Sequence, residues 1–177
     1  MNKAAARVSL MLMVSAPAFA EITLTSNDIV SGDPIPIAHI YPRCGGRNIS
    51  PQLSWGSAPS GTQSFVVTMI DVDVKPSQWS HWIVVDIPPS VASLPQAARS
   101  LPGRANAVVS NFGDAAYAGP CPPKGTGVHH YQFTIWAMPT TTVTLATDEK
   151  ATAVTDFLAQ RALDRGSLTA WVQAPAR

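Results

Sequence analysis

Three strand-length apolar runs, rich in β-branched and aromatic residues, constrain the fold of this chain most strongly. They read SFVVTMID at residues 64–71, HWIVVDI at 81–87 and YQFTIWAM at 131–138, and a shorter run at 168–172 can close a sheet. Proline- and glycine-rich turn signals separate these runs. The chain has 16 prolines and only 13% charged residues, where about 25% is typical, so a helical bundle or coiled coil is disfavoured. The sequence therefore predicts a mainly β fold.

A single helix is predicted near the C-terminus, between the last two strands. Thr147 can cap its first turn, and Gly166 can end it. The apolar residues between them recur at helical spacing, which predicts a stripe facing the core: Val154, Phe157, Leu158 and Ala162. No repeat, linker or low-complexity segment interrupts the chain, and its length is near the roughly 150 residues of one domain. We therefore expect a single domain over residues 21–177.

The first twenty residues have the three parts of a secretory signal peptide. Lys3 and Arg7 precede a short apolar run at residues 8–14, and Ala18 and Ala20 supply the small side chains of a processing site. This run is far below the roughly 20 residues that span a bilayer, and no other stretch reaches that length. We expect cleavage after Ala20 and export, most simply to a bacterial periplasm. A buried N-terminal helix is the alternative for this segment.

Charge and cysteine content exclude several other classes. The formal net charge of +1 gives no electrostatic footprint for nucleic acid. Two cysteines are too few for a disulfide-rich scaffold or a four-cysteine zinc site. Cys44 and Cys121 both lie in glycine- and proline-rich loops, and export would place them in an oxidising compartment. We expect a disulfide between them, and two unpaired thiols acting as small hydrophobes are the alternative.

Polar residues that core packing does not explain gather at the ends of the predicted strands. Asp71 ends the first strand and Asp73 lies two residues on, so an extended chain puts both on one side. His81 begins the second strand, and His129 and Tyr131 begin the third. Strand ends and their loops commonly carry binding sites. If Asp71 and His81 face a common pocket, the carboxylate should favour the protonated imidazole of His81, which together with the hydroxyl of Tyr131 can hold a small anion such as phosphate. Each residue alone is also compatible with a structural role as a turn cap or a hydrogen-bonded histidine.

Five short motifs follow one another in order along the chain. They are NISPQLSW at 48–55, DVD at 71–73, WSHW at 79–82, GPCPP at 119–123 and GVHHY at 127–131. Together they resemble the phosphatidylethanolamine-binding protein family, and its bacterial Raf kinase inhibitor-like branch in particular. The resemblance in order and spacing runs from about residue 23 to the C-terminus.

The resemblance implies a β-sandwich-like fold with a large antiparallel sheet, a smaller sheet and peripheral helices. It also implies a small pocket for phosphate-like anions and phospholipid head groups, with Trp79 at its rim. Carried over by motif, the pocket wall comprises Asp71, His81, Gly119, Pro120, Pro122, His129 and Tyr131.

Three positions depart from the family pattern. Val72 replaces the first proline of the usual D-P-D-x-P motif, and Lys75-Pro76 stands where the second is expected, which adds a cation near the mouth. His130 replaces the arginine of the usual H-R-Y motif, so a permanent charge and its fork are lost. On an extended strand His130 should point away from Tyr131, and therefore away from the pocket.

Three functional classes are compatible with these residues. An enzyme could use Asp71, His81 and His129 to bind a metal or as a general base, but no H-E-x-x-H or nucleophile-elbow pattern is present. A secreted protein-interaction or inhibitor module is a second alternative. We predict an exported, non-catalytic protein that binds a small anion or a phospholipid head group, with no cofactor and no metal. The sequence does not identify a protein partner.

Overall fold

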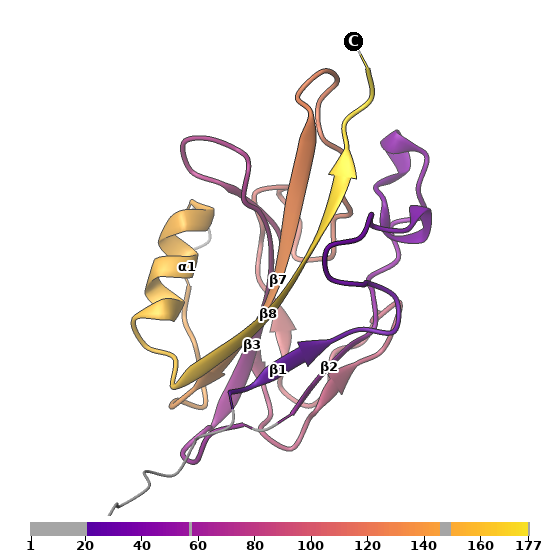
Figure 1. The fold of residues 1–177 in the computed structure, drawn as a ribbon. Coiled ribbons are helices and arrows are strands. Elements are labelled where there is room, and N and C mark those ends of the chain that lie inside the picture. The colour runs from indigo at the N-terminus through magenta and orange to yellow at the C-terminus, as the bar shows by residue number, and fades with distance from the viewer. Residues whose placement is uncertain (1–20, 57, 146–149, 177) are drawn as a thin grey trace, which may run out of the picture.

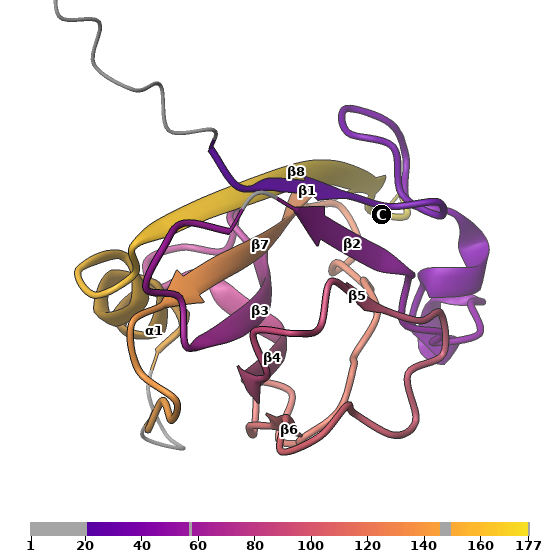
Figure 2. The ribbon, with the colours of Figure 1, turned by 90° about the horizontal axis from the view of Figure 1, so that it is seen from below.

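Two antiparallel β-sheets pack against each other, and an α-helix lies on the outer face of the larger sheet (Figures 1 and 2). The structure is a computed structural model that describes residues 21–56, 58–145 and 150–176. The predicted β-sandwich-like architecture, with its larger and smaller sheet and a helix near the C-terminus, is confirmed.

The larger sheet has five strands in the order β6-β4-β3-β7-β8, all of them antiparallel to their neighbours. Each of the four predicted strands is present in it. The first coincides with its prediction, and the other three extend further than predicted, because backbone pairing continues past the apolar runs. The strands are β3 (Ser64–Asp71), β4 (Trp79–Ile87), β6 (Asn106–Ala107), β7 (Val128–Met138) and β8 (Asp164–Gln173).

The smaller sheet has three short strands in the order β1-β2-β5. Two 3₁₀ turns, η1 and η2, lie between its first two strands in the chain. These elements are β1 (Thr23–Thr25), η1 (Ile37–His39), η2 (Pro42–Cys44), β2 (Leu53–Gly56) and β5 (Ser93–Leu94).

Every residue of β3 is buried, because the strand is covered on both of its faces. Phe65 faces the smaller sheet, where its ring meets Trp55 edge-on at 5.6 Å. Val66 faces the other way and packs in a second cluster with Val154 and Leu158 of the helix. This explains why the run at 64–71 is continuously apolar instead of alternating.

Helix α1 spans Ala151–Ala159, so the predicted helix exists but ends earlier than predicted. Val154 and Leu158 are buried, which confirms the core-facing stripe. Ala162 packs against the same cluster from outside the helix. The chain has already joined the sheet at Leu163, whose backbone N–H donates to the carbonyl of Ala137. The predicted cap, Thr147, lies outside the described residues.

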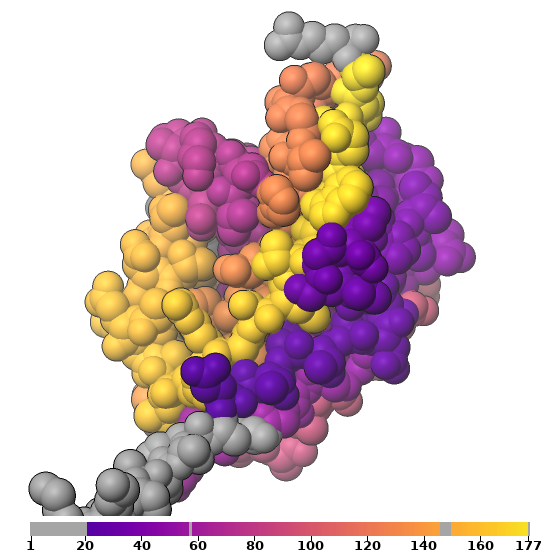
Figure 3. Space-filling view, viewed as in Figure 1, coloured from indigo at the N-terminus to yellow at the C-terminus, as the bar shows by residue number. Residues whose placement is uncertain are grey.

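Gly166 does not end the helix; that prediction was wrong. It lies inside β8, opposite Ile135 of β7. The N-terminal segment crosses β8 here, and a Cβ at Gly166 would collide with the carbonyl oxygen of Ile22. Figure 3 shows this crossing as indigo atoms lying directly against the yellow strand. The glycine is therefore required by the close approach of two segments that are distant in the sequence.

The predicted disulfide between Cys44 and Cys121 is present, with 5.5 Å between the two Cα atoms. It joins the end of η2 to the loop that precedes β7. Because it closes a loop of 77 positions, the chain-entropy description credits it with about 4 kcal/mol of stability.

Within the described ranges, no helix combines the length and the apolar content needed to cross a bilayer. Residues 1–20, with the predicted signal peptide and the cleavage site after Ala20, lie outside the described residues. Cleavage therefore stays a prediction.

Candidate functional site

Sheet topology brings three of the predicted site residues together at one end of the larger sheet. β3 runs antiparallel to both β4 and β7, so its C-terminal end meets their N-terminal ends. Asp71, the last residue of β3, lies opposite Trp79 on one side and Tyr131 on the other. Side chains of directly paired residues lie on the same face of a sheet, so all three project from one face.

A β-bulge places His81 in the same group. Met69 pairs with Trp82 and Ile70 pairs with Ser80, which leaves His81 as the extra residue of β4. Strict alternation would put His81 and Trp82 on opposite faces, but a bulge re-aims side chains locally. His81 packs edge-on against Tyr131, with 5.1 Å between ring centroids, while Trp82 enters the core between the sheets.

These side chains line a cavity of about 380 Å³. Trp79 is 40% exposed at its edge, whereas Asp71, His81 and Tyr131 are buried. The lining includes Asp71, Trp79, His81, Phe112, Pro122 and Tyr131.

His129 lies behind Asp71 and does not line the cavity. Its Nδ1 is 2.7 Å from Oδ2 of Asp71, and its Nε2 is 2.9 Å from Oγ1 of Thr126. The single hydroxyl proton of Thr126 is directed to the carbonyl of Pro123, 2.7 Å away, so Oγ1 is left to accept from His129. This set of hydrogen bonds is complete when both ring nitrogens of His129 carry a proton. Both ring nitrogens of His129 are therefore engaged.

The sequence prediction paired Asp71 with His81 and expected His81 to be protonated, and the structure contradicts this. His81 Nδ1 is 2.8 Å from the carbonyl oxygen of Ala118, so Nδ1 carries the proton and Nε2 has a free lone pair. Burial lowers the pKa of His81 from 6.5 to about 4, although the carbonyl of Ala118 and the charge of Asp71 act in the opposite direction. His81 is therefore neutral near pH 7, because its desolvation outweighs these attractions.

The hydroxyl of Tyr131 is buried and has no hydrogen-bond partner among the described residues. Burial, followed by the nearby charge of Asp71, raises the pKa of this hydroxyl, so it keeps its proton. A buried polar group without a partner costs stability, which makes such groups exceptional and often functional. This hydroxyl is thus a donor that a molecule in the cavity can satisfy.

Phe112 and Arg43 are among the lining residues that the sequence analysis missed. The Phe112 ring lies 4.8 Å from the His81 ring and 6.3 Å from that of Trp79. Its loop is fixed by Ser80, whose N–H and hydroxyl both donate to Oδ1 of Asn111. No strand pattern marks this segment, so the sequence held no signal for Phe112. Arg43 directly precedes Cys44, so the predicted disulfide was a signal that could have placed it beside the Cys121 loop.

Gly119 and Pro120 were predicted in the pocket wall but are not lining residues. Both are buried where they hold the loop against the segment around η1 and η2. The N–H of Gly119 donates to Oδ1 of Asn48 at 2.7 Å, and the carbonyl of Pro120 accepts from Tyr41. A Cβ at Gly119 would collide with the carbonyl of His39, so glycine is needed for this approach. Pro122 does line the cavity, as predicted.

Asp73 does not share the side of Asp71, which corrects the sequence expectation. The chain turns after β3, and the N–H of Asp73 donates to Oδ1 of Asp71 at 3.0 Å. Asp73 instead pairs with Nδ1 of His130 at 2.8 Å, outside the cavity. His130 thus points away from Tyr131, as predicted. The ammonium of Lys75 donates to the carbonyl of Val72 in its own loop.

Within the described part of the chain, no three His, Cys, Asp or Glu side chains are grouped so that they could hold a metal ion. His129 has both ring nitrogens in hydrogen bonds, and His81 has one. The arrangement is suited to holding a ligand by hydrogen bonds from Tyr131 and to Nε2 of His81.

Comparison with known proteins agrees with this geometry. The family profile described as phosphatidylethanolamine-binding protein matches residues 25–173. The UPF0098 protein YbcL of Escherichia coli K12 is 43% identical over 129 residues, which is 68% of this chain and 70% of that protein. LppC of Mycobacterium tuberculosis, whose name describes it as a lipoprotein, is 37% identical over 70% of this chain and 59% of its own length.

Solved structures extend the likeness to the fold. The crystal structure of E. coli YbcL, described as a new member of the mammalian PEBP family, matches with a TM-score of 0.79 and 35% identity. The match covers 89% of this chain and 100% of that one. A homologue from Chlamydia trachomatis matches with a TM-score of 0.70 and 27% identity over 86% of this chain and 97% of that one. The chain belongs to the phosphatidylethanolamine-binding protein family.

Proposed function

We propose that this chain is an exported, non-catalytic binding protein whose cavity takes a phosphate-like anion or the phosphate of a phospholipid head group. The observation that carries the proposal is the buried Tyr131 hydroxyl, which has no hydrogen-bond partner among the described residues. The ring of Tyr131 packs edge-on against that of neutral His81, whose Nε2 is free to accept. One group donates and the other accepts. Inorganic phosphate or a phosphomonoester satisfies both with one unprotonated and one protonated oxygen, and a phosphodiester head group satisfies both when Nε2 of His81 takes up a proton and donates it.

The charges around the cavity favour an anion. The carboxylate of Asp71 is compensated by His129 directly behind it. Arg43 lines the cavity and takes part in no ion pair among the described residues. A guanidinium fork suits phosphate oxygens in particular. Arg43 therefore gives the cavity lining a positive charge that an anion can meet.

The neutral state of His81 predicts that binding is coupled to a proton. Phosphate groups exchange their second proton with a pKa of about 6. The complex holds one proton between the phosphate and Nε2 of His81, either as P–OH donating to the ring or as an imidazolium donating to the phosphate. Affinity should therefore fall as the pH rises above the second phosphate pKa, because the proton must then be taken from solution.

The hydrogen bonds of the histidines support a binding protein over a hydrolase. His129 is fully engaged by Asp71 and Thr126, so it has no nitrogen left for a metal or a substrate proton. The hydroxyl of Ser80, the serine next to His81, is held by Asn111. We therefore propose that the residues of this site hold a ligand without transforming it.

Export is proposed from the signal-peptide pattern at residues 1–20, from the disulfide, and from a relative named as a lipoprotein. N-terminal sequencing of protein recovered from the periplasm should find Glu21 as the first residue. A chain beginning at Met1 in that fraction would contradict cleavage after Ala20.

Calorimetric titration of inorganic phosphate into three proteins tests the site: wild type, His81→Ala and His39→Ala. His39 is a matched control because it is also buried and its Nδ1 also bonds a backbone carbonyl, at 2.7 Å from Ile49. Loss of His81 should weaken phosphate binding by about 1.5–3 kcal/mol, whereas loss of His39 should leave affinity unchanged. Melting curves of the three proteins check that each variant is folded. Equal affinity in all three proteins would overturn the proposed site.

A further inference from the structure

A second cavity, of about 420 Å³, shares no lining residue with the cavity around His81, which we call the anion cavity. Three segments contribute most of its lining, at residues 47–50, 97–99 and 115–117. We call it the arginine cavity, because an arginine from each of the first two segments lines it. The two cavities are therefore separate features of the fold.

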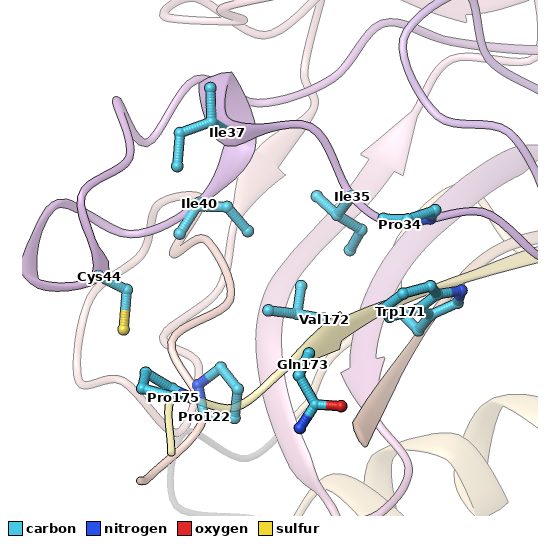
Figure 4. Close-up of a pocket in the computed structure, with 10 residues that line it drawn as sticks. All are labelled: Pro34, Ile35, Ile37, Ile40, Cys44, Pro122, Trp171, Val172, Gln173 and Pro175. Atoms are coloured by element: carbon cyan, nitrogen blue, oxygen red, sulfur yellow. The ribbon is translucent and has the colours of Figure 1, made fainter. Parts of the chain in front are cut away.

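The arginine cavity has two cationic side chains in its lining and no acidic one. Arg47 and Arg99 are exposed, and neither forms an ion pair within the described part of the chain. By contrast, the apolar groove in Figure 4, which shares Pro122 with the anion cavity, has no charged residue in its lining. Two guanidinium groups that no carboxylate of the protein engages can both pair with an anion.

Hydrogen bonds between its segments shape the arginine cavity, and they hold two residues in an unusual conformation. Asn48 and Ala97 both have φ of 54°, in the left-handed region that residues other than glycine rarely adopt. The N–H of Ala97 donates to the carbonyl of Ser50 at 2.9 Å, and the side chain of Asn48 donates to the carbonyl of Tyr117 at 3.1 Å. Such strained residues cluster at ligand sites.

The interior of the arginine cavity combines a free donor with apolar surface. Ser50 is 5% exposed; its Oγ accepts from the N–H of Ala98 at 3.0 Å, and its proton has no acceptor among the described residues. The buried rings of Trp82 and Tyr117 meet edge-on at 5.6 Å and line the cavity together with alanine methyl groups. A cation would meet only like charge here, and a wholly polar anion would leave the aromatic and methyl surface without a partner.

We propose that the arginine cavity is a second binding site, for a small organic carboxylate with a flat apolar body. The carboxylate pairs with Arg47 and Arg99, whose planar forks match its geometry, and takes the hydroxyl of Ser50 as a further donor. The apolar body lies against Trp82 and Tyr117. This site is independent of the proposed function, because none of these five residues lines the anion cavity.

Calorimetric titration of the wild type with acetate, benzoate, 2-naphthoate and benzamide tests the ligand class. Affinity should rise from acetate to benzoate and again to 2-naphthoate, by at least about fivefold at each step, because each step buries roughly 40 Å² or more of further apolar surface. Benzamide keeps the ring of benzoate without its charge, so it should bind at least about tenfold more weakly than benzoate.

Three arginine variants locate the carboxylate. Arg47→Gln and Arg99→Gln should each weaken benzoate binding by about three- to fivefold, which is the range of an exposed ion pair. Arg104→Gln is the matched control, because Arg104 is also exposed but does not line the cavity. It removes the same charge and should leave benzoate affinity unchanged. All three side chains are exposed, so the changes should not affect folding.

Four results would overturn the second site. The wild type could fail to bind benzoate and 2-naphthoate, or it could bind benzamide as tightly as benzoate. A loss of affinity in Arg104→Gln equal to that in the two cavity variants would show a general effect of charge. A loss in Arg43→Gln, without one in Arg47→Gln or Arg99→Gln, would place benzoate in the anion cavity instead.

Discussion

The molecule contains two Asp–His pairs that are close in sequence, nearly equal in length and opposite in surroundings. In the inner pair, Asp71 and His129 are 2.7 Å apart and their side chains are 4% and 8% exposed. In the outer pair, Asp73 and His130 are 2.8 Å apart and their side chains are 38% and 48% exposed. The residue types and the distances alone therefore do not indicate which pair belongs to the cavity.

Burial decides what each pair does. The outer pair holds the turn after β3 to the start of β7, because Asp73 also accepts the backbone N–H of His130. Slight burial acts to raise the pKa of Asp73, but these hydrogen bonds from His130 lower it below its usual value. The inner pair fixes the Asp71 carboxylate in the cavity wall and compensates its charge. Only the inner pair contributes a residue, Asp71, to the cavity lining.

Replacing the carboxylate of each pair in turn should give the largest difference in stability between two variants. Asp71→Asn leaves the buried ring of His129 without its counter-charge, and breaking a buried pair in this way costs about 3–5 kcal/mol of unfolding free energy. Asp73→Asn should cost only about 0.2–1 kcal/mol, because solvent replaces an exposed partner. Urea unfolding of both variants at neutral pH measures the two losses. Similar losses would mean that the pairs are energetically equivalent.

The pH dependence of stability should differ between a variant of His81, which is buried in the cavity wall, and a variant of His130, which is exposed outside the cavity. The pKa of His81 is about 4 in the folded protein and 6.5 ordinarily, so between these values the unfolded chain binds a proton that the folded chain does not. Stability should therefore fall as the pH drops from 6.5 to about 4, and His81 should contribute about 3 kcal/mol to that fall.

Unfolding titrations across this range should be run on wild type, His81→Asn and His130→Asn. The His81 variant should lose much of the acid-induced decline, and the His130 variant should keep it. A decline in stability of equal size in wild type and His81→Asn would show that His81 is not a buried neutral group in the folded protein.

Two buried tyrosines provide a finer contrast. The hydroxyl of Tyr117 donates to the carbonyl of His39 at 2.9 Å, whereas that of Tyr131 has no partner among the described residues. Tyr117→Phe should destabilise the fold by about 1 kcal/mol, while Tyr131→Phe should leave stability unchanged or raise it. The Tyr131 variant should instead weaken phosphate binding by about 0.5–1.5 kcal/mol. Chemical unfolding and calorimetry measure both quantities, and a loss of stability without a loss of affinity in Tyr131→Phe would contradict the site.

The strands of this fold could be predicted from the sequence because their signal is local. The run at 64–71 is nearly continuous in apolar residues, and β3 occupies the same residues. The C-terminal half of the fold shows where this fails. A glycine at position 166 is typical of a residue that ends a helix. Glycine is required there because the backbone of Ile22 crosses β8 at this point, and that contact joins residues far apart in the chain. No local pattern reports such a crossing.

The sequence predicted which residues belong to the site better than it predicted which of them pair with each other. Motif resemblance placed Asp71, His81 and Tyr131 together, and the structure brings them to one cavity. It did not indicate that Asp71 pairs with His129, because that partnership depends on the register between β3 and β7. The state of His81 was also misjudged, since burial, which no motif encodes, dominates its pKa.

The most direct test of the central claim is the affinity of wild type and His81→Ala for inorganic phosphate, measured by calorimetry from about pH 6 to about pH 8. If neutral His81 accepts a proton from the ligand, wild-type affinity should fall with rising pH, by up to about tenfold per unit above the second phosphate pKa. His81→Ala should bind more weakly and lose most of this dependence. Wild-type affinity that rises with pH, or that matches the variant throughout, would mean that the dianion binds without His81 and would contradict the account.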